Sequence, residues 1–323
     1  MMRIIAIFML AMLIPGMLKG QEYSFSHYYL DMLSVSPGYV SMGKSSEAAV
    51  ALRSQWTGID GGYRIYMAGY QHKMPAYNSG LGIRISGNSS GGGAFSTTCA
   101  TATYGYNFHL SYKVKCAIGI EAGYINRSLH QGGLVYYSGI DPATGSIHGG
   151  EGAIASQEAS HSITFGTGAV FYTKATTISL GLARISNTVI SGPSNNYPTV
   201  ISVSAGHIIS LGGYGALPKI TLKPEVMASH SRYSDIIMPG VYLQARKLLL
   251  SLAYRCELQP YRYGAVVTTV GISLGRMDLT IGHDFETSAL IKSAQGSTEA
   301  GIRYKFENDE KNSGSKTIMC PAF

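Results

Sequence analysis

The nine histidines are the first residues to examine for chemistry, because imidazole serves both as a general base and as a metal ligand. They are scattered singly, and no HExxH pattern occurs. His283 and Asp284 are adjacent in a predicted strand, so their side chains point to opposite faces and cannot form a dyad. His130, His148 and His161 lie in or beside the longest predicted loop. They could meet around a metal ion, but we favour plain polar loop residues.

The glycine-rich stretch Asn88–Gly93 lacks the Gly-Lys-Ser/Thr ending of a phosphate-binding loop, and no strand–loop–helix unit surrounds it. The four cysteines, at positions 99, 116, 256 and 320, show neither a CxxC pair nor metal-ligand spacing. We therefore expect no catalytic residue, no cofactor and no resident metal, and the protein is predicted not to be an enzyme.

The composition indicates what kind of scaffold holds these residues. Only 13% of the residues are charged, about half the usual share, while 45% are hydrophobic, and the chain has 40 glycines and 23 tyrosines. The only long apolar run, Ile4–Ile14, is shorter than the roughly 20 residues that a membrane-spanning helix needs. These features exclude a disordered chain and a helical membrane protein, and they favour a transmembrane β-barrel.

Segments of about ten residues with period-two alternation fill the chain after residue 46, as is typical of membrane barrels. Tyr104, Tyr106 and Phe108 share one strand face, and Gly105 and Asn107 share the other. The pattern predicts an all-β fold, a transmembrane antiparallel β-barrel of about 14 strands. The predicted strands are 47–56, 62–73, 78–87, 96–110, 113–127, 162–173, 175–184, 198–210, 218–231, 235–244, 246–255, 263–274, 276–284 and 297–306.

Charged residues on the other faces of these strands point into the predicted lumen. They could line a channel, pair with one another or anchor an internal plug, and the sequence leaves all three open. The residues are Arg53, Arg84, Glu121, Arg127, Asp278, Glu299, Arg303 and Lys305.

The connections differ in length, and this predicts the orientation of the barrel. Ser111-Tyr112, Thr173-Lys174 and Gly275 are tight turns, whereas 128–161, 186–197 and 285–296 read as long loops, together with the shorter glycine-rich loop 88–93. Barrels of this kind have short periplasmic turns and long outer loops, so the tight turns and both termini are predicted to lie in the periplasm.

The N-terminus has the layout of a secretory signal peptide, with Arg3 before an apolar run, and the predicted cut falls near Gly20. The predicted parts are therefore a signal peptide (1–20), a periplasmic or plug segment (21–46), an outer-membrane barrel (47–306) and a periplasmic tail (307–323). The formal charge of +7 includes Arg3 and Lys19 of the signal peptide. The rest is spread thinly along the chain, so no nucleic-acid partner is expected.

Two stretches near the N-terminus carry a family resemblance. Ser36-Pro37-Gly38-Tyr39-Val40 is followed by Leu52-Arg53-Ser54-Gln55-Trp56-Thr57-Gly58-Ile59-Asp60-Gly61. This pair resembles the opening of the PorP/SprF family of type IX secretion system membrane proteins of Bacteroidetes, which shows an NPAYAG-like and then an RSQWxGIDG-like element. The residues that match the family motif are Pro37, Tyr39, Arg53, Ser54, Gln55, Trp56, Gly58, Ile59, Asp60 and Gly61.

The resemblance implies an outer-membrane component of the type IX secretion and gliding machinery that docks or attaches an adhesin-like secreted cargo protein at the cell surface. It also implies contacts with periplasmic ring proteins, in addition to outer-membrane lipid. The alternative is a porin-like or substrate-specific channel, which the predicted fold permits equally well.

The motif also has a purely structural interpretation. Trp56 would sit at the lipid–water boundary with its indole N–H hydrated, and Arg53 would face the lumen. The turn residues of the first outer loop would be Gly58, Asp60, Gly61 and Gly62.

Overall fold

The computed structural model describes residues 24–43, 45–130, 141, 144, 157–192, 197–211, 220–259, 263–287 and 295–306. The predicted signal peptide (1–20), the predicted tail (307–323) and His148 lie outside these residues. No helix in the described part is long and apolar enough to cross a membrane.

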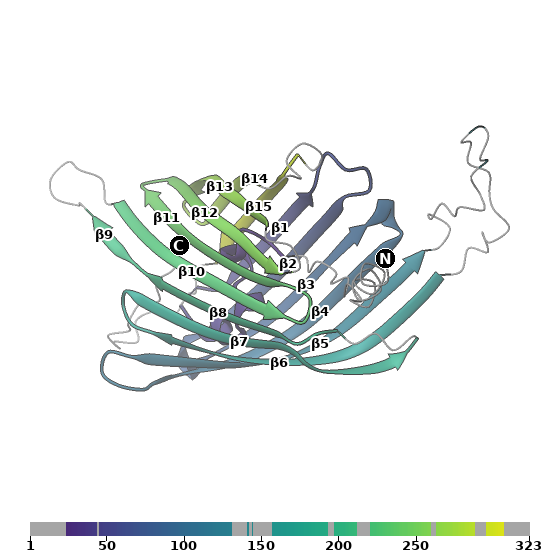
Figure 1. The fold of residues 1–323 in the computed structure, drawn as a ribbon. Coiled ribbons are helices and arrows are strands. Elements are labelled where there is room, and N and C mark those ends of the chain that lie inside the picture. The colour runs from purple at the N-terminus through teal and green to yellow at the C-terminus, as the bar shows by residue number, and fades with distance from the viewer. Residues whose placement is uncertain are drawn as a thin grey trace, which may run out of the picture.

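The described strands form one antiparallel sheet that closes on itself (Figure 1). β1 pairs with β15 along its whole length, and β10 pairs with β11, so the ring has no open seam. The strands are β1 (Glu47–Gln55), β2 (Tyr63–Met74), β3 (Ser79–Ser90), β4 (Phe95–His109), β5 (Lys115–His130), β6 (Gln157–Tyr172), β7 (Thr176–Ser191), β8 (Val200–His207), β9 (Ile209–Leu211), β10 (Ile220–Ser231), β11 (Asp235–Ala245), β12 (Leu248–Gln259), β13 (Tyr263–Leu274), β14 (Met277–Glu286) and β15 (Ser297–Lys305).

β8 and β9 occupy one position in the ring, because both pair with β10 and only Ile208 separates them. The closed barrel therefore has 14 strands, which confirms the predicted fold class and strand number. An even number is the rule for single-chain bacterial barrels.

Side chains alternate across the wall as predicted. On β12, Leu252 and Tyr254 are 58% and 43% exposed, whereas Ala253, Arg255 and Glu257, at the alternate positions, are buried. Among the described strand residues, the large exposed hydrophobic side chains lie on the outer face of the barrel, and most of the charged side chains are buried inside it. This arrangement suits a wall with lipid on its outer face.

The strands run further towards the long-loop end than the sequence suggested. β3 continues through Asn88, and β7 continues through Ser186 to Ser191, so the predicted loop starts at Asn88 and Ser186 are wrong. His130 and His161 likewise lie on strands. Polar residues here do not signal a loop, because a lumen-facing or water-exposed strand position needs no apolar side chain.

The two sides of the barrel differ in height. β4 to β7, which we call the tall wall, have 15 or 16 residues each. β12 to β15 together with β1, the short wall, have only 9 to 12. A tilted strand crosses a bilayer in about 9–11 residues. The tall wall therefore has more residues than a bilayer crossing requires, and on β7 the extra residues lie beyond Ala183, at the long-loop end.

Candidate functional site: a plugged lumen

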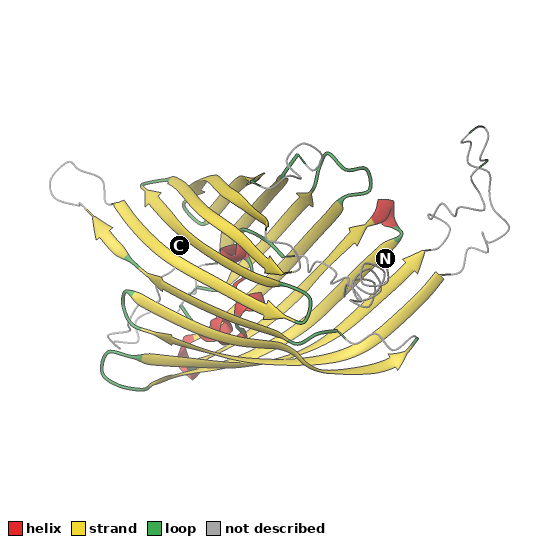
Figure 2. Cartoon of the chain, viewed as in Figure 1, coloured by secondary structure: helices red, strands yellow, loops and turns green. Residues whose placement is uncertain are grey.

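Residues 24–42 lie inside the barrel and form a plug, drawn as short red helices within the ring in Figure 2. The plug contains η1 (Tyr28–Leu30), α2 (Met32–Val35) and η2 (Pro37–Ser41). Ser36 shapes the last turn, because its hydroxyl accepts from the Gly38 amide at 3.4 Å and donates to the Leu180 carbonyl at 2.9 Å. Pro37 follows at the first helical position, where a missing N–H costs nothing.

The apolar side chains of the plug pack against wall residues from around the ring. Tyr28, Leu33, Val35, Tyr39, Val40 and Met42 of the plug share one buried cluster with Ala117, Val170, Tyr172, Met227, Met238, Ala253 and Val267 of the wall. These wall residues come from β5, β6, β10, β11, β12 and β13. The plug therefore crosses the lumen from one side to the other.

The tall wall and β3 receive the plug through a groove of glycines. At each of these positions an added Cβ would lie within 3 Å of a plug atom, which is closer than real Cβ atoms approach. Gly181, for example, faces the carbonyl of Val35, and Gly119 faces Pro37. The groove consists of Gly80, Gly82, Gly105, Gly119, Gly168 and Gly181. Glycine is required here for close backbone approach, and this use explains part of the high glycine content.

The short wall holds the plug by buried ion pairs. Arg53 of β1 bonds Asp284 of β14 at 2.7 Å and also pairs with Glu299 of β15. The plug enters this network through Ser26, whose hydroxyl donates to Asp284 at 2.6 Å and whose amide donates to Glu299 at 2.6 Å. The amide of His27 donates to the other oxygen of Glu299 at 2.9 Å. Each of the three charged residues is at most 4% exposed.

A second arginine extends this network. Arg255 of β12 bonds Glu257 at 2.8 Å and donates to the Ser24 carbonyl and the Ser26 hydroxyl, both at 3.4 Å. Asp278 pairs with Lys305 at 3.0 Å and with Arg303 at 3.4 Å nearer the tight-turn end. Among the three alternatives for the lumenal charges, pairing with one another and anchoring a plug are therefore the ones observed.

Two further polar contacts hold the plug, one at Tyr39 and Val40 and one at Asp31. Lys73 donates from Nζ to the carbonyls of Tyr39 and Val40 at 2.9 and 2.8 Å. Asp31 accepts from Arg84 of β3 at 3.0 Å. Charge-assisted hydrogen bonds of this kind are roughly twice as strong as neutral ones.

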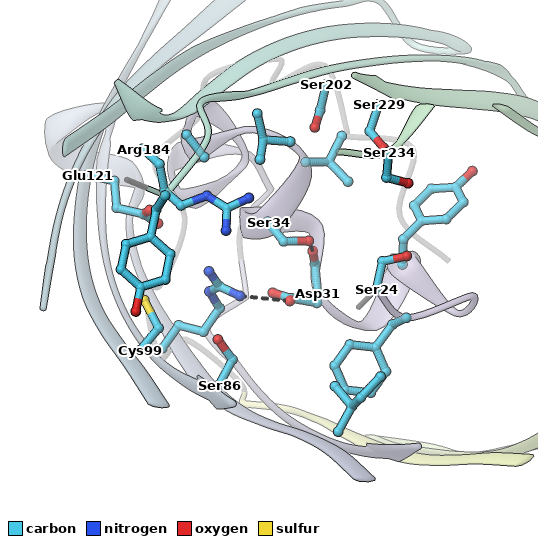
Figure 3. Close-up of a pocket in the computed structure, with 18 of the residues that line it drawn as sticks. Ser24, Asp31, Ser34, Ser86, Cys99, Glu121, Arg184, Ser202, Ser229 and Ser234 are labelled. Atoms are coloured by element: carbon cyan, nitrogen blue, oxygen red, sulfur yellow. Dashed lines mark hydrogen bonds and ion pairs between the residues drawn. The ribbon is translucent and has the colours of Figure 1, made fainter. Parts of the chain in front are cut away.

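A cavity of about 180 Å³ remains beside the plug (Figure 3). Asp31 and Ser34 of the plug border it, and Glu121 and Arg184 line it from the tall wall. Of the predicted lumenal charges, Arg84 and Glu121 therefore face this cavity, whereas Arg127 is exposed near the outer end of β5.

Burial raises the pKa of the plug residue Tyr29 to about 12, so this phenol stays neutral at physiological pH.

The structure places the family-motif residues in several different parts of the barrel. Pro37 and Tyr39 belong to the plug, and Arg53 and Gln55 point into the lumen, where Arg53 Nε donates to Gln55 at 3.3 Å. Ser54 points outwards, and the remaining motif residues after Trp56 form the exposed turn before β2. That turn comprises Gly58, Ile59, Asp60 and Gly61.

The predicted environment of Trp56 is wrong in one respect. Its indole Nε1 is buried and has no hydrogen-bond partner among the described residues, so the N–H is not hydrated. The cause is local backbone geometry, because Trp56 has a positive φ of 59°. Its ring packs edge-on against the ring of Tyr63, with the two ring centroids 5.5 Å apart. This turn brings the ring onto the protein instead of into the boundary water.

Sequence reasoning did not single out the wall glycines or Ser26 as functional. The alternation of faces along each strand could have pointed to such positions, because Gly105, Gly119 and Glu299 all face the lumen. His283 and Asp284 point to opposite faces, as predicted: Asp284 is 1% exposed in the ionic network, and His283 contacts Phe285. The described residues contain no cluster of three or more His, Cys, Asp or Glu side chains arranged to hold a metal ion.

One sequence match to a catalytic motif has no matching structure. Gly87–Gly91 spells Gly-x-Ser-x-Gly, yet Ser89 lies near the end of β3, which is followed by a three-residue turn and β4. A nucleophile elbow requires a strand-to-helix turn. Ser89 therefore lacks the setting of a hydrolase nucleophile.

A closed 14-strand barrel with an apolar exterior, buried lumenal charges and an internal plug defines an outer-membrane β-barrel protein. The family described as "Type IX secretion system membrane protein PorP/SprF" matches residues 17–304, so the chain belongs to this family. It is accordingly a barrel component of a type IX secretion system, and its family and fold are those of a secretion-system barrel.

Three solved structures with a similar chain course are only 9–12% identical to this chain. The toluene transporter TbuX of Ralstonia pickettii is 12% identical, with 90% of this chain and 96% of that chain covered and a TM-score of 0.49. The CymD monoaromatic hydrocarbon channel is 10% identical, with the same coverage and a TM-score of 0.48. A Pseudomonas aeruginosa FadL homologue is 9% identical over 84% and 93% of the two chains, with a TM-score of 0.46. No curated protein sequence matches the chain.

Proposed function

We propose that this protein is a docking barrel that attaches an adhesin-like secreted cargo protein at the cell surface and contacts the periplasmic secretion machinery. It acts by binding and not by catalysis. The observation that carries this proposal is the plug, which is packed around the ring, fitted into a glycine groove and bonded to buried charges. A segment held in three ways suits a permanently closed barrel better than a conduit for solutes.

Conductance in planar bilayers tests whether the lumen is closed. The purified protein is expected to be silent, whereas a variant lacking residues 24–42 should open steady channels and serve as the positive control. Large, steady openings of the full-length protein would overturn the docking proposal and favour the porin-like alternative.

Loss of surface cargo tests the attachment role. Deleting the gene should remove one or a few secreted proteins from the surface, measured by mass spectrometry of peptides shaved from intact cells. A wild-type copy should restore them. An unchanged set of surface proteins in the deletion strain would contradict the proposal.

The polar tail, residues 307–323, is proposed as a contact to the periplasmic machinery, and it lies outside the described residues. Deleting residues 311–323 retains every strand and should leave barrel abundance and heat-modifiable gel mobility unchanged. It should reduce the recovery of periplasmic partner proteins with the purified barrel. Full recovery would remove the tail from the proposal.

A further inference from the structure

The cavity beside the plug lies towards the long-loop end of the barrel. Its lining includes Ser234, in the turn between β10 and β11, and Val200, the first residue of β8. Its volume is about 180 Å³, and an apolar protein cavity of about 150 Å³ admits benzene. The space therefore fits a molecule built on one six-membered ring.

A bulge in β7 turns a charged side chain into this cavity. Leu180 is 46% exposed and Ser179 is fully buried, so the even-numbered positions of β7 face outwards. Arg184 would follow them if the alternation continued. Instead β7 advances four residues, from Leu182 to Ser186, where β6 advances only two, and Arg184 adopts a positive φ of 57°. A bulge re-aims a side chain in this way, and Arg184 extends into the cavity in Figure 3.

Two hydroxyl groups on the cavity wall are buried without a hydrogen-bond partner among the described residues. They belong to Thr164 of β6 and to Ser234, which are 3% and 4% exposed. Buried hydroxyls are nearly always hydrogen-bonded, because leaving one unpaired costs stability. The two residues come from different parts of the ring and share only the cavity, so both indicate a polar occupant as the missing partner.

The charged residues of the lining are balanced in sign. Arg84 and Arg184 contribute two guanidinium groups, and Asp31 and Glu121 contribute two carboxylates. Arg84 and Asp31 bond each other at 3.0 Å. An anion would meet the carboxylates and a cation would meet the guanidinium groups, and like charges in contact are costly. A neutral ligand with both donors and acceptors therefore suits this wall best.

We propose that this cavity binds one neutral pyranose ring, either a free saccharide or the terminal sugar of a glycan. Each sugar hydroxyl both donates and accepts, so it can pair with guanidinium donors, carboxylate acceptors and the hydroxyls of Thr164 and Ser234. Phe25, Ile65 and Ile125 line the same cavity and offer apolar contact to the C–H groups of the ring. The inference does not depend on the docking role, because it concerns the lumen itself.

Calorimetric titration of the full-length protein in detergent tests the site, with the methyl glycosides of glucose, galactose, mannose and N-acetylglucosamine as probes. At least one should bind, and Ser234→Ala should weaken its binding roughly fivefold, as expected for one lost hydrogen bond. Ser162→Ala is the matched control, because this hydroxyl is also buried without a described partner but does not line the cavity. It should bind sugar like the wild type. No binding of any probe, or equal weakening in both variants, would overturn the inference.

A second set of titrations tests the charge of the ligand. Arg184→Met should weaken the bound glycoside roughly tenfold, since hydrogen bonds to charged groups are the stronger ones. Arg276→Met, at an exposed tight turn, should not, and equal heat-modifiable mobility shows that both barrels are folded. Methyl glucuronide and glucosamine carry a charge and should bind more weakly than the uncharged glycosides. Tighter binding of either would overturn the neutral sugar in favour of a charged ligand.

Beads that carry the bound sugar distinguish its two sources. The sugar is coupled through its anomeric oxygen on a long linker. Capture of the wild-type barrel, but not of Ser234→Ala, supports the terminal sugar of a glycan. Binding of the free glycoside without capture supports a free saccharide.

Discussion

The short wall and the tall wall hold the same plug differently: both approach it closely at glycines, and the short wall adds buried charges. The short wall uses charge: Arg53, Asp284 and Glu299 are almost fully buried and bond the Ser26 and His27 backbone. The tall wall uses shape: glycines such as Gly119 and Gly181 remove side chains so that the plug backbone can lie against the sheet. The buried charges bind specific N–H groups of the plug, and the glycines let its backbone lie close to the sheet. Together these contacts hold the plug in one position.

The two walls also differ in height. The short wall is only as tall as a bilayer requires and closes fully with its neighbours. The tall wall has more residues per strand than a bilayer crossing requires, and β7 continues to Ser191, beyond Ala183, where its pairing with β8 ends.

The largest effect is expected from breaking the short-wall contact. Arg53→Met leaves Asp284 and Glu299 buried without their cation, which should cost about 3–5 kcal/mol of stability. The measurement is the urea midpoint of the refolded barrel, followed by heat-modifiable mobility. Arg127→Met, at an exposed position, is the control and should shift the midpoint little. Equal midpoints for both variants would contradict the role given to the ion pairs.

Breaking the tall-wall contact should have the next largest effect. Gly181→Ala places a Cβ against the Val35 carbonyl, and relieving that overlap should cost about 1–3 kcal/mol. Gly69→Ala on β2 is the matched control, because its Cβ would meet its nearest neighbour at an ordinary 3.5 Å. If the two alanine variants unfold at the same urea concentration, the glycine groove does not constrain the plug.

A smaller effect is expected at the contact between the plug residue Asp31 and Arg84 of β3. Asp31→Asn removes the charge that faces Arg84 but keeps an acceptor oxygen, so the loss should be about 1 kcal/mol. Protease accessibility of the plug in the folded barrel should rise slightly with it. A loss as large as that of Arg53→Met would mean that the short wall has no privileged role.

The smallest effect is expected at Trp56, where the turn joins the short wall. Trp56→Phe removes a buried N–H that has no described partner, so stability should change by less than about 0.5 kcal/mol. Because Trp56 is the only tryptophan, its fluorescence also reports its surroundings. Brominated lipid should quench a ring at the lipid boundary strongly, and weak quenching is expected for a ring packed on Tyr63.

The sequence by itself determined the barrel. Period-two alternation fixes which side chains face lipid, and lumenal positions such as Arg53, Asp278 and Glu299 were readable from parity alone, because a strand offers only two faces. The closed ring of 14 strands agrees with the count made from the pattern. The motif around Trp56 likewise indicated the family, and the match to that family covers residues 17–304.

Only the tertiary structure decided what fills the barrel. Plug and wall meet over separations such as the 273 residues between Ser26 and Glu299, and no local pattern encodes a contact of that kind. The glycine groove is invisible in sequence for the same reason, since a lumenal glycine reads as a weak strand residue until a backbone is seen against it. How far β7 runs beyond its pairing with β8 depends on where β8 begins, opposite Ala183, and the residues of β7 alone do not show this.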